Sequence, residues 1–181
     1  MADKITVRLR GLVRAAGVRR LGGADTVLVD IDGTMTDGLL HIQVATADGV
    51  TKPFKSFSSD DSDALRLLSQ LGVRVILVSA DGQGSAILEQ RAKDIGVEWY
   101  IVPGMDRFYR LQEFAEVAAS RVVYIGDGYW DGSTFQEVGF GIATANALHK
   151  TKKMADAILS RSGGNKAIAQ AVDYIIERLM V

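Results

Sequence analysis

Two aspartates, Asp30 and Asp32, stand one residue apart between the apolar run at 27–29 and Gly33. Two carboxylates this close repel each other and resist burial, so their charge must serve a cation or a phosphate. A carboxylate can attack phosphorus and form an aspartyl-phosphate. A second carboxyl group can protonate the leaving oxygen and then deprotonate water. The pair therefore predicts covalent phosphoryl chemistry.

Polar side chains also follow two other apolar runs of the chain. Ser79 ends one run, and Asp127 follows another, with Asp131 four residues later. In an open parallel sheet, ligands bind beyond the carboxyl ends of the strands, so these groups and Asp30 can meet at one edge. Mg²⁺ prefers oxygen ligands and keeps waters that a phosphate can displace. The sequence therefore predicts a Mg²⁺ site that takes a phosphate ester.

Other ligand motifs do not fit the spacing. A calcium loop also begins with D-x-D, but Met35 stands where it needs glycine and His41 stands where it needs glutamate. A P-loop is excluded because no G-x-x-x-x-G-K occurs. The glycines at 82 and 84 lack the third glycine of a dinucleotide fingerprint, and no G-x-S-x-G elbow occurs.

The composition excludes further classes of protein. The 181 residues contain no cysteine and two histidines, which rules out thiol nucleophiles and a histidine-rich metal site. The formal net charge of −1 gives no basic excess, so we expect no nucleic-acid partner. No apolar run reaches the roughly 20 residues of a membrane helix. We therefore expect no membrane partner and a cytoplasmic location.

Short apolar runs alternate with segments of helical period along most of the chain. Apolar residues three and four apart predict helices at 64–72, 86–96 and 108–119. This alternation predicts an α/β fold with a mainly parallel sheet that has helices on both faces. We expect its strands at 26–31, 73–79, 98–102, 121–126 and 139–144.

One segment after the first strand breaks this alternation. Residues 39–57 show rough period-two alternation and contain the turn pair Asp48 and Gly49. This pattern predicts a small β-hairpin flap over about 37–57. The hairpin is too small to close a site, so we expect no cap domain.

The two ends of the chain carry helical patterns. The basic segment 5–20 is typical of a targeting peptide or of a leading amphipathic helix with exposed arginines, and we expect the helix. The tail from about 163 to 181 predicts a terminal helix at 165–180. Because no linker and no repeat interrupts the chain, we expect a single domain over residues 1–181.

Several stretches resemble one family. DIDGTMTDG at 30–38 resembles the first motif of the haloacid dehalogenase superfamily of phosphatases, and GDGYWD at 126–131 resembles its fourth, metal-binding motif. The order of KPFKSFSSDDSDAL, RAKDIGVEWYIVPG and ADAILSRSGGNKAI further resembles the subfamily typified by 3-deoxy-D-manno-octulosonate 8-phosphate phosphatase. The resemblance covers about residue 24 to the C-terminus. It implies a Rossmann-like three-layer sandwich without a cap, and a homotetramer whose hairpins pair and whose tails cover neighbouring sites.

The resemblance also implies roles for the aspartates. Asp30 would be the nucleophile and Asp32 the general acid/base. Mg²⁺ would be bound by the Asp30 carboxylate, the main-chain carbonyl of Asp32 and Asp127. The substrate would be a small sugar-derived or keto-sugar phosphate, hydrolysed through an aspartyl-phosphate.

The same resemblance assigns the phosphate-binding groups. Ser79 takes the place of the second-motif Ser/Thr, and Arg107 takes the place of the third-motif lysine. These two residues and Gly33 would bind phosphate. Asp131 and Thr34 would support the site.

The chain departs from the subfamily pattern at four places. Arg107 replaces lysine, and Gly128 replaces the second aspartate of the fourth motif. SADGQG stands at 79–84 in place of a TGR-like stretch, and Asn165 and Lys166 replace the tail arginine. These departures motivate an alternative: a non-catalytic or substrate-shifted relative that serves as a binding or assembly protein.

Overall fold

A seven-stranded sheet forms the centre of the computed structural model, which describes residues 6–7, 24–44, 51–116 and 119–179. The strands are β1 (Thr6–Val7), β2 (Thr26–Asp30), β5 (Arg74–Ser79), β6 (Glu98–Ile101), β7 (Val122–Gly126), β8 (Phe140–Ala143) and β9 (Ala157–Ile158). Their order is β1-β9-β8-β7-β2-β5-β6, and every pair is parallel except β1 with β9. The predicted mainly parallel α/β sheet is confirmed.

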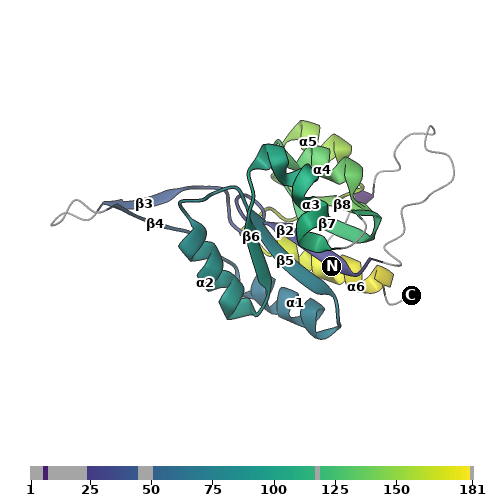
Figure 1. Ribbon diagram of the computed structural model, residues 1–181, viewed down its shortest axis with the longest axis horizontal. Coiled ribbons are helices and arrows are strands. Elements are labelled where there is room, and N and C mark those ends of the chain that lie inside the picture. Colours follow the sequence, from purple (N-terminus) through teal and green to yellow (C-terminus); the bar gives the residue numbers. More distant parts are fainter. Residues whose placement is uncertain (1–5, 8–23, 45–50, 117–118, 180–181) are drawn as a thin grey trace.

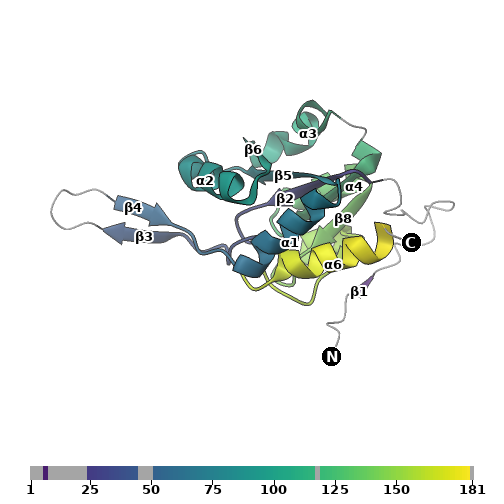
Figure 2. The same cartoon turned by 90° about the horizontal axis from the view of Figure 1, so that it is seen from below.

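Helices cover both faces of this sheet (Figures 1 and 2). They are α1 (Ser59–Gln70), α2 (Ser85–Ile95), α3 (Arg107–Ala115), α4 (Asp131–Glu137), α5 (His149–Met154) and α6 (Ala167–Leu179). Short 3₁₀ turns occupy Gly104–Asp106 and Ala119–Arg121. One apolar core joins α1, α2 and α6 to the sheet, and a second core joins α4 to the opposite face. The three layers are those of the predicted sandwich.

Strand β2 shows why the strands could be predicted from apolar runs. The side chains of Val27 and Val29 belong to one core, whereas Leu28 belongs to the other, and all three are fully buried. A strand that is covered on both faces needs apolar residues at every position. The run at 27–29 therefore reads as continuous rather than alternating.

A two-stranded hairpin follows β2 and extends away from the body of the molecule (Figures 1 and 2). Its antiparallel strands are β3 (His41–Val44) and β4 (Thr51–Phe54). The predicted flap is confirmed, and its expected turn at Asp48 and Gly49 lies outside the described residues. In the described part of the chain, the hairpin is the only element between β2 and α1.

The prediction of a leading helix at 5–20 is wrong at Thr6–Val7, which pairs as β1 with Ala157–Ile158. The rest of that segment lies outside the described residues. A two-residue strand has no periodic signal, because its state is decided by the partner strand it meets. Helices α4 and α5, at seven and six residues, are also too short to show a helical period.

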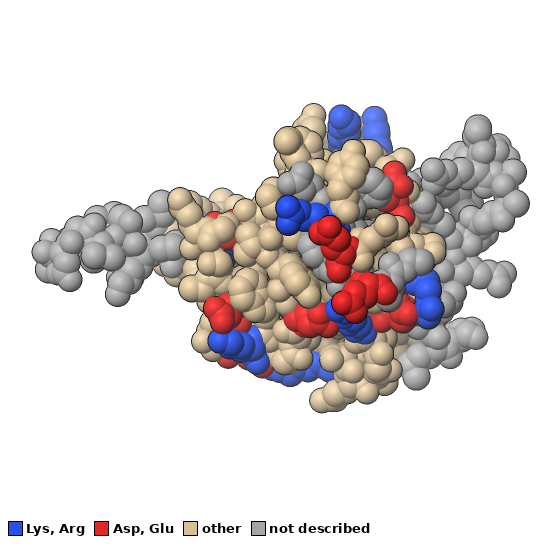
Figure 3. Space-filling view, in the orientation of Figure 1, with Lys and Arg blue, Asp and Glu red and all other residues tan. Residues whose placement is uncertain are grey.

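Charge on the surface is mixed in sign. Figure 3 shows lysine and arginine side chains interspersed with aspartate and glutamate on one face, without a continuous basic patch among the coloured residues. No helix among the described residues has the length and apolar character that crossing a membrane requires.

Candidate active site

The ends of three adjacent strands bring the predicted site residues together. Strands β7, β2 and β5 are neighbours in the sheet, and Asp30 is paired in register with Val78. Asp30 is the last residue of β2, Ser79 is the last of β5, and Asp127 follows β7 directly. The three polar groups therefore lie at one carboxyl edge of the sheet, as the sequence predicts.

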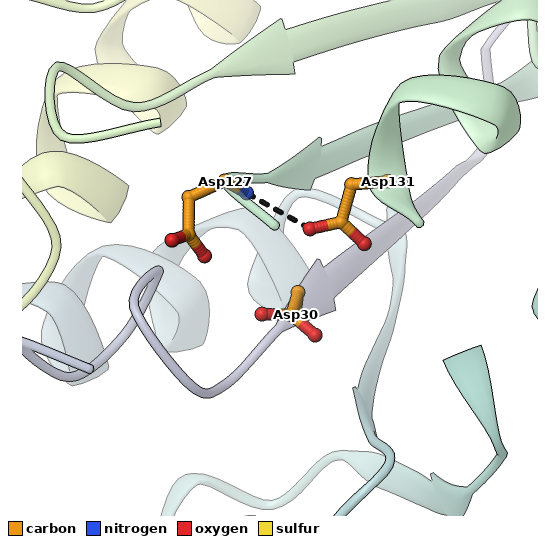
Figure 4. Close-up of side chains that lie close together, drawn as sticks. All are labelled: Asp30, Asp127 and Asp131. Atoms are coloured by element: carbon orange, nitrogen blue, oxygen red, sulfur yellow. Dashed lines mark hydrogen bonds between the residues drawn. The ribbon is translucent and has the colours of Figure 1, made fainter. Parts of the chain in front are cut away.

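Three aspartates form a compact acidic cluster at this edge (Figure 4). One carboxylate oxygen from each of Asp30, Asp127 and Asp131 lies within 4.8 Å of the others. Asp30 and Asp131 are buried, and Asp127 is partly buried. Oxygen ligands at this separation suit a hard cation such as Mg²⁺.

Asp131 is held in place by the backbone of the loop that precedes it. It is the first residue of α4, and its Oδ2 accepts hydrogen bonds from the N–H groups of Asp127, at 2.9 Å, and Gly128, at 2.7 Å. A Cβ at Gly126 would lie 2.6 Å from the Asp131 carboxyl carbon, so glycine is needed there. These contacts fix the geometry of the fourth-motif loop.

A buried arginine connects two of the three carboxylates. Nη1 of Arg107 lies 2.7 Å from Oδ1 of Asp30 and 2.7 Å from Oδ1 of Asp131. The same nitrogen donates to the hydroxyl of Tyr124 at 2.6 Å, and that hydroxyl donates to Asp131 at 2.7 Å. Two N–H protons and one O–H proton thus serve three acceptors. Arg107 bonds to Oδ1 of Asp30, and Oδ2 of Asp30 makes none of these hydrogen bonds.

Burial and mutual repulsion raise the proton affinity of the acidic cluster. Burial raises the pKa of Asp30 well above its usual value, and the nearby Asp131 carboxylate raises it further. Burial likewise raises the pKa of Asp127 to about 6. Three carboxylates around one guanidinium leave an excess of negative charge, which a divalent cation would neutralise.

Asp32 is not one of the three clustered carboxylates, and its hydrogen bonds go to other residues. Its Oδ1 accepts a hydrogen bond from Nζ of Lys55 at 2.6 Å, and its Oδ2 accepts one from Oγ of Ser79 at 2.9 Å. Its side chain is 40 % exposed, whereas that of Asp30 is 7 % exposed. The structure therefore brings Ser79 to Asp32, and it separates the surroundings of the two neighbouring aspartates.

Lys55 and Asp81 belong to the site but were not predicted from the sequence. Nζ of Lys55 lies 2.9 Å from Oδ2 of Asp81. Burial lowers the pKa of Lys55, but hydrogen bonds to Asp32 and Asp81 outweigh it, so the pKa lies above its ordinary value. The hydrogen bond from Lys55 lowers the pKa of Asp81. In the sequence, Lys55 lies in KPFKSF, which is part of the resemblance, whereas Asp81 lies in SADGQG, where the chain departs from the subfamily pattern.

The loop after β2 is packed tightly against Asp127. Gly33 has a φ of +92°, and a Cβ there would lie 2.2 Å from Oδ2 of Asp127, so no other residue fits. The N–H of Gly33 donates to Oγ1 of Thr36 at 3.2 Å. Thr34 donates from Oγ1 to Oδ1 of Asp127 at 2.9 Å. Both predicted residues thus border the acidic cluster.

Asn146 is a further residue that the sequence did not reveal. Its Nδ2 donates to the carbonyl of Gly33 at 2.8 Å and lies 3.4 Å from Oδ2 of Asp127. Its Oδ1 accepts a hydrogen bond from the N–H of Gly163 at 2.7 Å. A single amide therefore connects the first-motif loop, the fourth-motif aspartate and the start of the tail.

Comparison with known proteins gives consistent matches. A family model described as haloacid dehalogenase-like hydrolase matches residues 106–172. The 3-deoxy-D-manno-octulosonate 8-phosphate phosphatase KdsC of Haemophilus influenzae is 30% identical over 162 residues, which are 88% of this chain and 86% of the relative. The phosphatase of the same name from Yersinia pestis is 26% identical and covers 90% of this chain and 82% of its own.

Solved structures match over a similar extent. The cobalt-bound form of the deoxy-D-mannose-octulosonate 8-phosphate phosphatase YrbI from Haemophilus influenzae has a TM-score of 0.76 at 30% identity, covering 87% of this chain and 90% of its own. The Moraxella catarrhalis 3-deoxy-D-manno-octulosonate 8-phosphate phosphatase, in complex with magnesium, phosphate and KDO, has a TM-score of 0.78 at 24% identity, covering 88% and 90%. At this lower identity, the second likeness shows the fold alone.

Proposed function

Because this chain belongs to the haloacid dehalogenase-like hydrolases, within the family of 3-deoxy-D-manno-octulosonate 8-phosphate phosphatases, we propose that it hydrolyses a phosphomonoester with Mg²⁺ through an aspartyl-phosphate on Asp30. One observation carries the proposal. Asp30 is buried at a strand end within 4.8 Å of two further carboxylates, while Arg107 holds only one of its oxygens. A carboxylate used only for structure would have no need of this arrangement.

The donor set fits a divalent cation. The Asp30 and Asp127 carboxylates and the main-chain carbonyl of Asp32 would bind Mg²⁺, and Asp131 would support them from the backbone of the loop. Bound there, the ion supplies charge neutralisation between the nucleophile and the phosphate dianion. The carboxylates of this cluster are all hard oxygen donors, as Mg²⁺ prefers.

The reaction then divides between the two neighbouring aspartates. A carboxylate oxygen of Asp30 attacks phosphorus, and the bond from phosphorus to the ester oxygen breaks. Asp32 gives its proton to the leaving oxygen and takes one from the water that attacks the aspartyl-phosphate. The second step releases inorganic phosphate and regenerates both carboxyl groups.

The remaining predicted residues would hold the phosphate and the loop. Ser79 would donate its hydroxyl to a phosphate oxygen, and the backbone at Gly33 would approach the phosphate closely because no Cβ intervenes. Arg107 would bind the phosphate beside the nucleophile, whose charge it also offsets through its hydrogen bond to Asp30, and Thr34 would orient Asp127. We propose a sugar-derived or keto-sugar phosphate as substrate, in line with the octulosonate phosphate for which the relatives are named.

We also propose that the chain is one domain that assembles as a homotetramer. The hairpin β3–β4 exposes the side chain of Phe54, and Leu39 and Leu40 before it are exposed as well. An exposed apolar group of this kind suits pairing with a second copy. Light scattering in solution tests the assembly, and a monomer at all concentrations would contradict it. The cytoplasmic location stays a prediction.

Phosphate release from a panel of sugar phosphates, keto-acid phosphates and nucleotides tests the function. We expect release that requires Mg²⁺, stops with EDTA and favours a sugar or keto-sugar ester. The alternative, a non-catalytic binding or assembly protein, predicts no release from any member of the panel. Release that persists in EDTA would contradict the metal role.

A further inference from the structure

Lys55 stands where the hairpin rejoins the body of the protein. It follows Phe54, the last residue of β4, and α1 begins at Ser59. Although lysine is usually an exposed residue, the side chain of Lys55 is only 6 % exposed. An ammonium group on a side chain with so little exposure is stable only where carboxylates pair with it, so the partners of Lys55 indicate its role.

Both partners of Lys55 lie at the candidate active site. Nζ is 2.6 Å from Oδ1 of Asp32 and 2.9 Å from Oδ2 of Asp81. Asp81 is itself fixed, because its Oδ1 accepts the N–H of Gly84 at 2.9 Å. A Cβ at Gly84 would lie 2.4 Å from Oδ2 of Asp81, so the absence of a side chain leaves room for this carboxylate. Lys55 is therefore anchored on one side and holds Asp32 on the other.

Asp32 needs such a hold more than Asp30 does. Its side chain is 40 % exposed, and an exposed carboxylate samples several rotamers unless contacts select one. Ser79 provides the second contact, at 2.9 Å. However, a serine hydroxyl has one proton to donate, and the proposed function assigns that proton to a phosphate oxygen. Once substrate binds, Lys55 is the group that still orients Asp32.

We infer that Lys55 is a positioning residue for the hydrolysis, which acts by holding the Asp32 carboxyl group toward the leaving oxygen. This inference rests on the proposed acid/base role of Asp32. Lys55 also connects Asp32 to the end of the hairpin, because it directly follows β4. A charge-assisted hydrogen bond is about twice as strong as a neutral one, which suits this purpose.

The dependence of kcat/KM on the leaving group distinguishes a positioning role of Lys55 from a role in folding alone. An alkyl phosphate needs a proton from Asp32 when its oxygen leaves, whereas p-nitrophenolate leaves as a stable anion and needs little help. The ratio kcat/KM reports this first step for both substrates. Loss of a positioning residue should therefore lower kcat/KM mainly for the alkyl ester, whereas loss of a structural tie should lower both alike.

The experiment measures kcat/KM of Lys55→Met with p-nitrophenyl phosphate and with the best sugar phosphate of the panel. We expect kcat/KM for the sugar phosphate to fall by a factor about ten times or more larger than the fall for p-nitrophenyl phosphate. The reason is that general acid catalysis contributes roughly 10²- to 10⁴-fold to the release of a poor leaving group. Lys55→Arg should restore much of the activity. Lys93→Met is the matched control, because Lys93 forms an exposed ion pair with Glu89 far from Asp32 in the chain. This variant should leave kcat/KM unchanged for both substrates.

Asp32→Asn, measured in parallel, distinguishes the possible failures. If Asp32→Asn shows the selective loss and Lys55→Met loses both substrates equally, the inference is overturned and the proposed function stands. If Asp32→Asn itself shows no selectivity, the acid role is wrong and the inference falls with it. Should Lys55→Met fail to fold, Asp81→Asn loosens the anchor while keeping Lys55, and the same selective loss is expected in smaller measure.

Discussion

The two aspartates of the first motif have opposite surroundings although one residue separates them. The pair of Asp30 and Arg107 is buried, with side chains 7 % and 5 % exposed, and it shares Asp131 and Tyr124 as further partners. In the pair of Asp32 and Lys55, the lysine side chain is 6 % exposed and the carboxylate side chain is 40 % exposed. One side of the loop is enclosed, and the other is open to solvent.

This difference fits two different chemical duties. A buried ion pair is stable only when every charge is satisfied, so its members have little freedom to move. A nucleophile benefits from that rigidity, because attack requires close alignment with phosphorus. An acid/base group must instead reach the leaving oxygen in one step and a water in the next. Partial exposure lets both the leaving oxygen and the water reach Asp32, while Lys55 holds its carboxyl group in place.

The substitution Asp30→Asn breaks the enclosed side at its centre and should have the largest effect. An amide does not attack phosphorus, so we expect turnover to fall by at least about 10³-fold. Because burial raises the pKa of this carboxyl group, its replacement by a neutral amide should not lower the melting temperature. Phosphate release measures the expected loss of turnover, and thermal unfolding measures the melting temperature. Retention of more than about a tenth of wild-type turnover would contradict the nucleophile role.

The substitution Arg107→Met tests whether the enclosed pair also matters for folding. It leaves Asp30 and Asp131 without their buried cation, which should lower the free energy of unfolding by about 3 to 5 kcal/mol. Arg74→Met is the matched control, since Arg74 pairs with Glu98 at 2.6 Å on the surface, and it should cost about 1 kcal/mol or less. Urea unfolding without metal measures both. Equal losses would show that burial makes no difference here.

The pH dependence of Mg²⁺ binding tests the enclosed side of the site further, and it is the smallest of the three expected effects. Asp127 has its pKa raised to about 6, so in the metal-free protein it favours folding below its unfolded pKa of 3.8, and this contribution is lost as the pH rises through about 6. Mg²⁺ needs the ionised carboxylate, so its affinity should fall about tenfold per pH unit below about 6. Thermal shift titrations with Mg²⁺ measure this affinity, and a flat profile from about pH 5 to 7 would contradict it.

The sheet could be predicted almost to the residue because its strands are continuous apolar runs. Strand β2 was expected at 26–31 and spans Thr26–Asp30, and β7 was expected at 121–126 and spans Val122–Gly126. Burial on both faces imposes this composition regardless of the rest of the fold. Strands β1 and β9 escaped prediction because they consist of two residues each and exist only through pairing.

The sequence predicted those site residues that lie in recognisable motifs. Asp30, Ser79 and Asp127 lie at strand ends, where topology alone brings them together. Lys55 and Tyr124 could not be found in this way. Tyr124 lies within the buried strand β7 and reads as a core residue, and Lys55 reaches the site only because the hairpin returns the chain beside Asp32.

Chemical trapping of the intermediate tests the central claim most directly. The protein is mixed with Mg²⁺ and its best substrate, quenched within one turnover, and treated with borohydride, which reduces an acyl phosphate to the alcohol. Peptide mass spectrometry should then find homoserine in place of aspartate at Asp30, and no change without substrate. An unmodified Asp30 during active turnover, or homoserine at Asp32, would contradict the account.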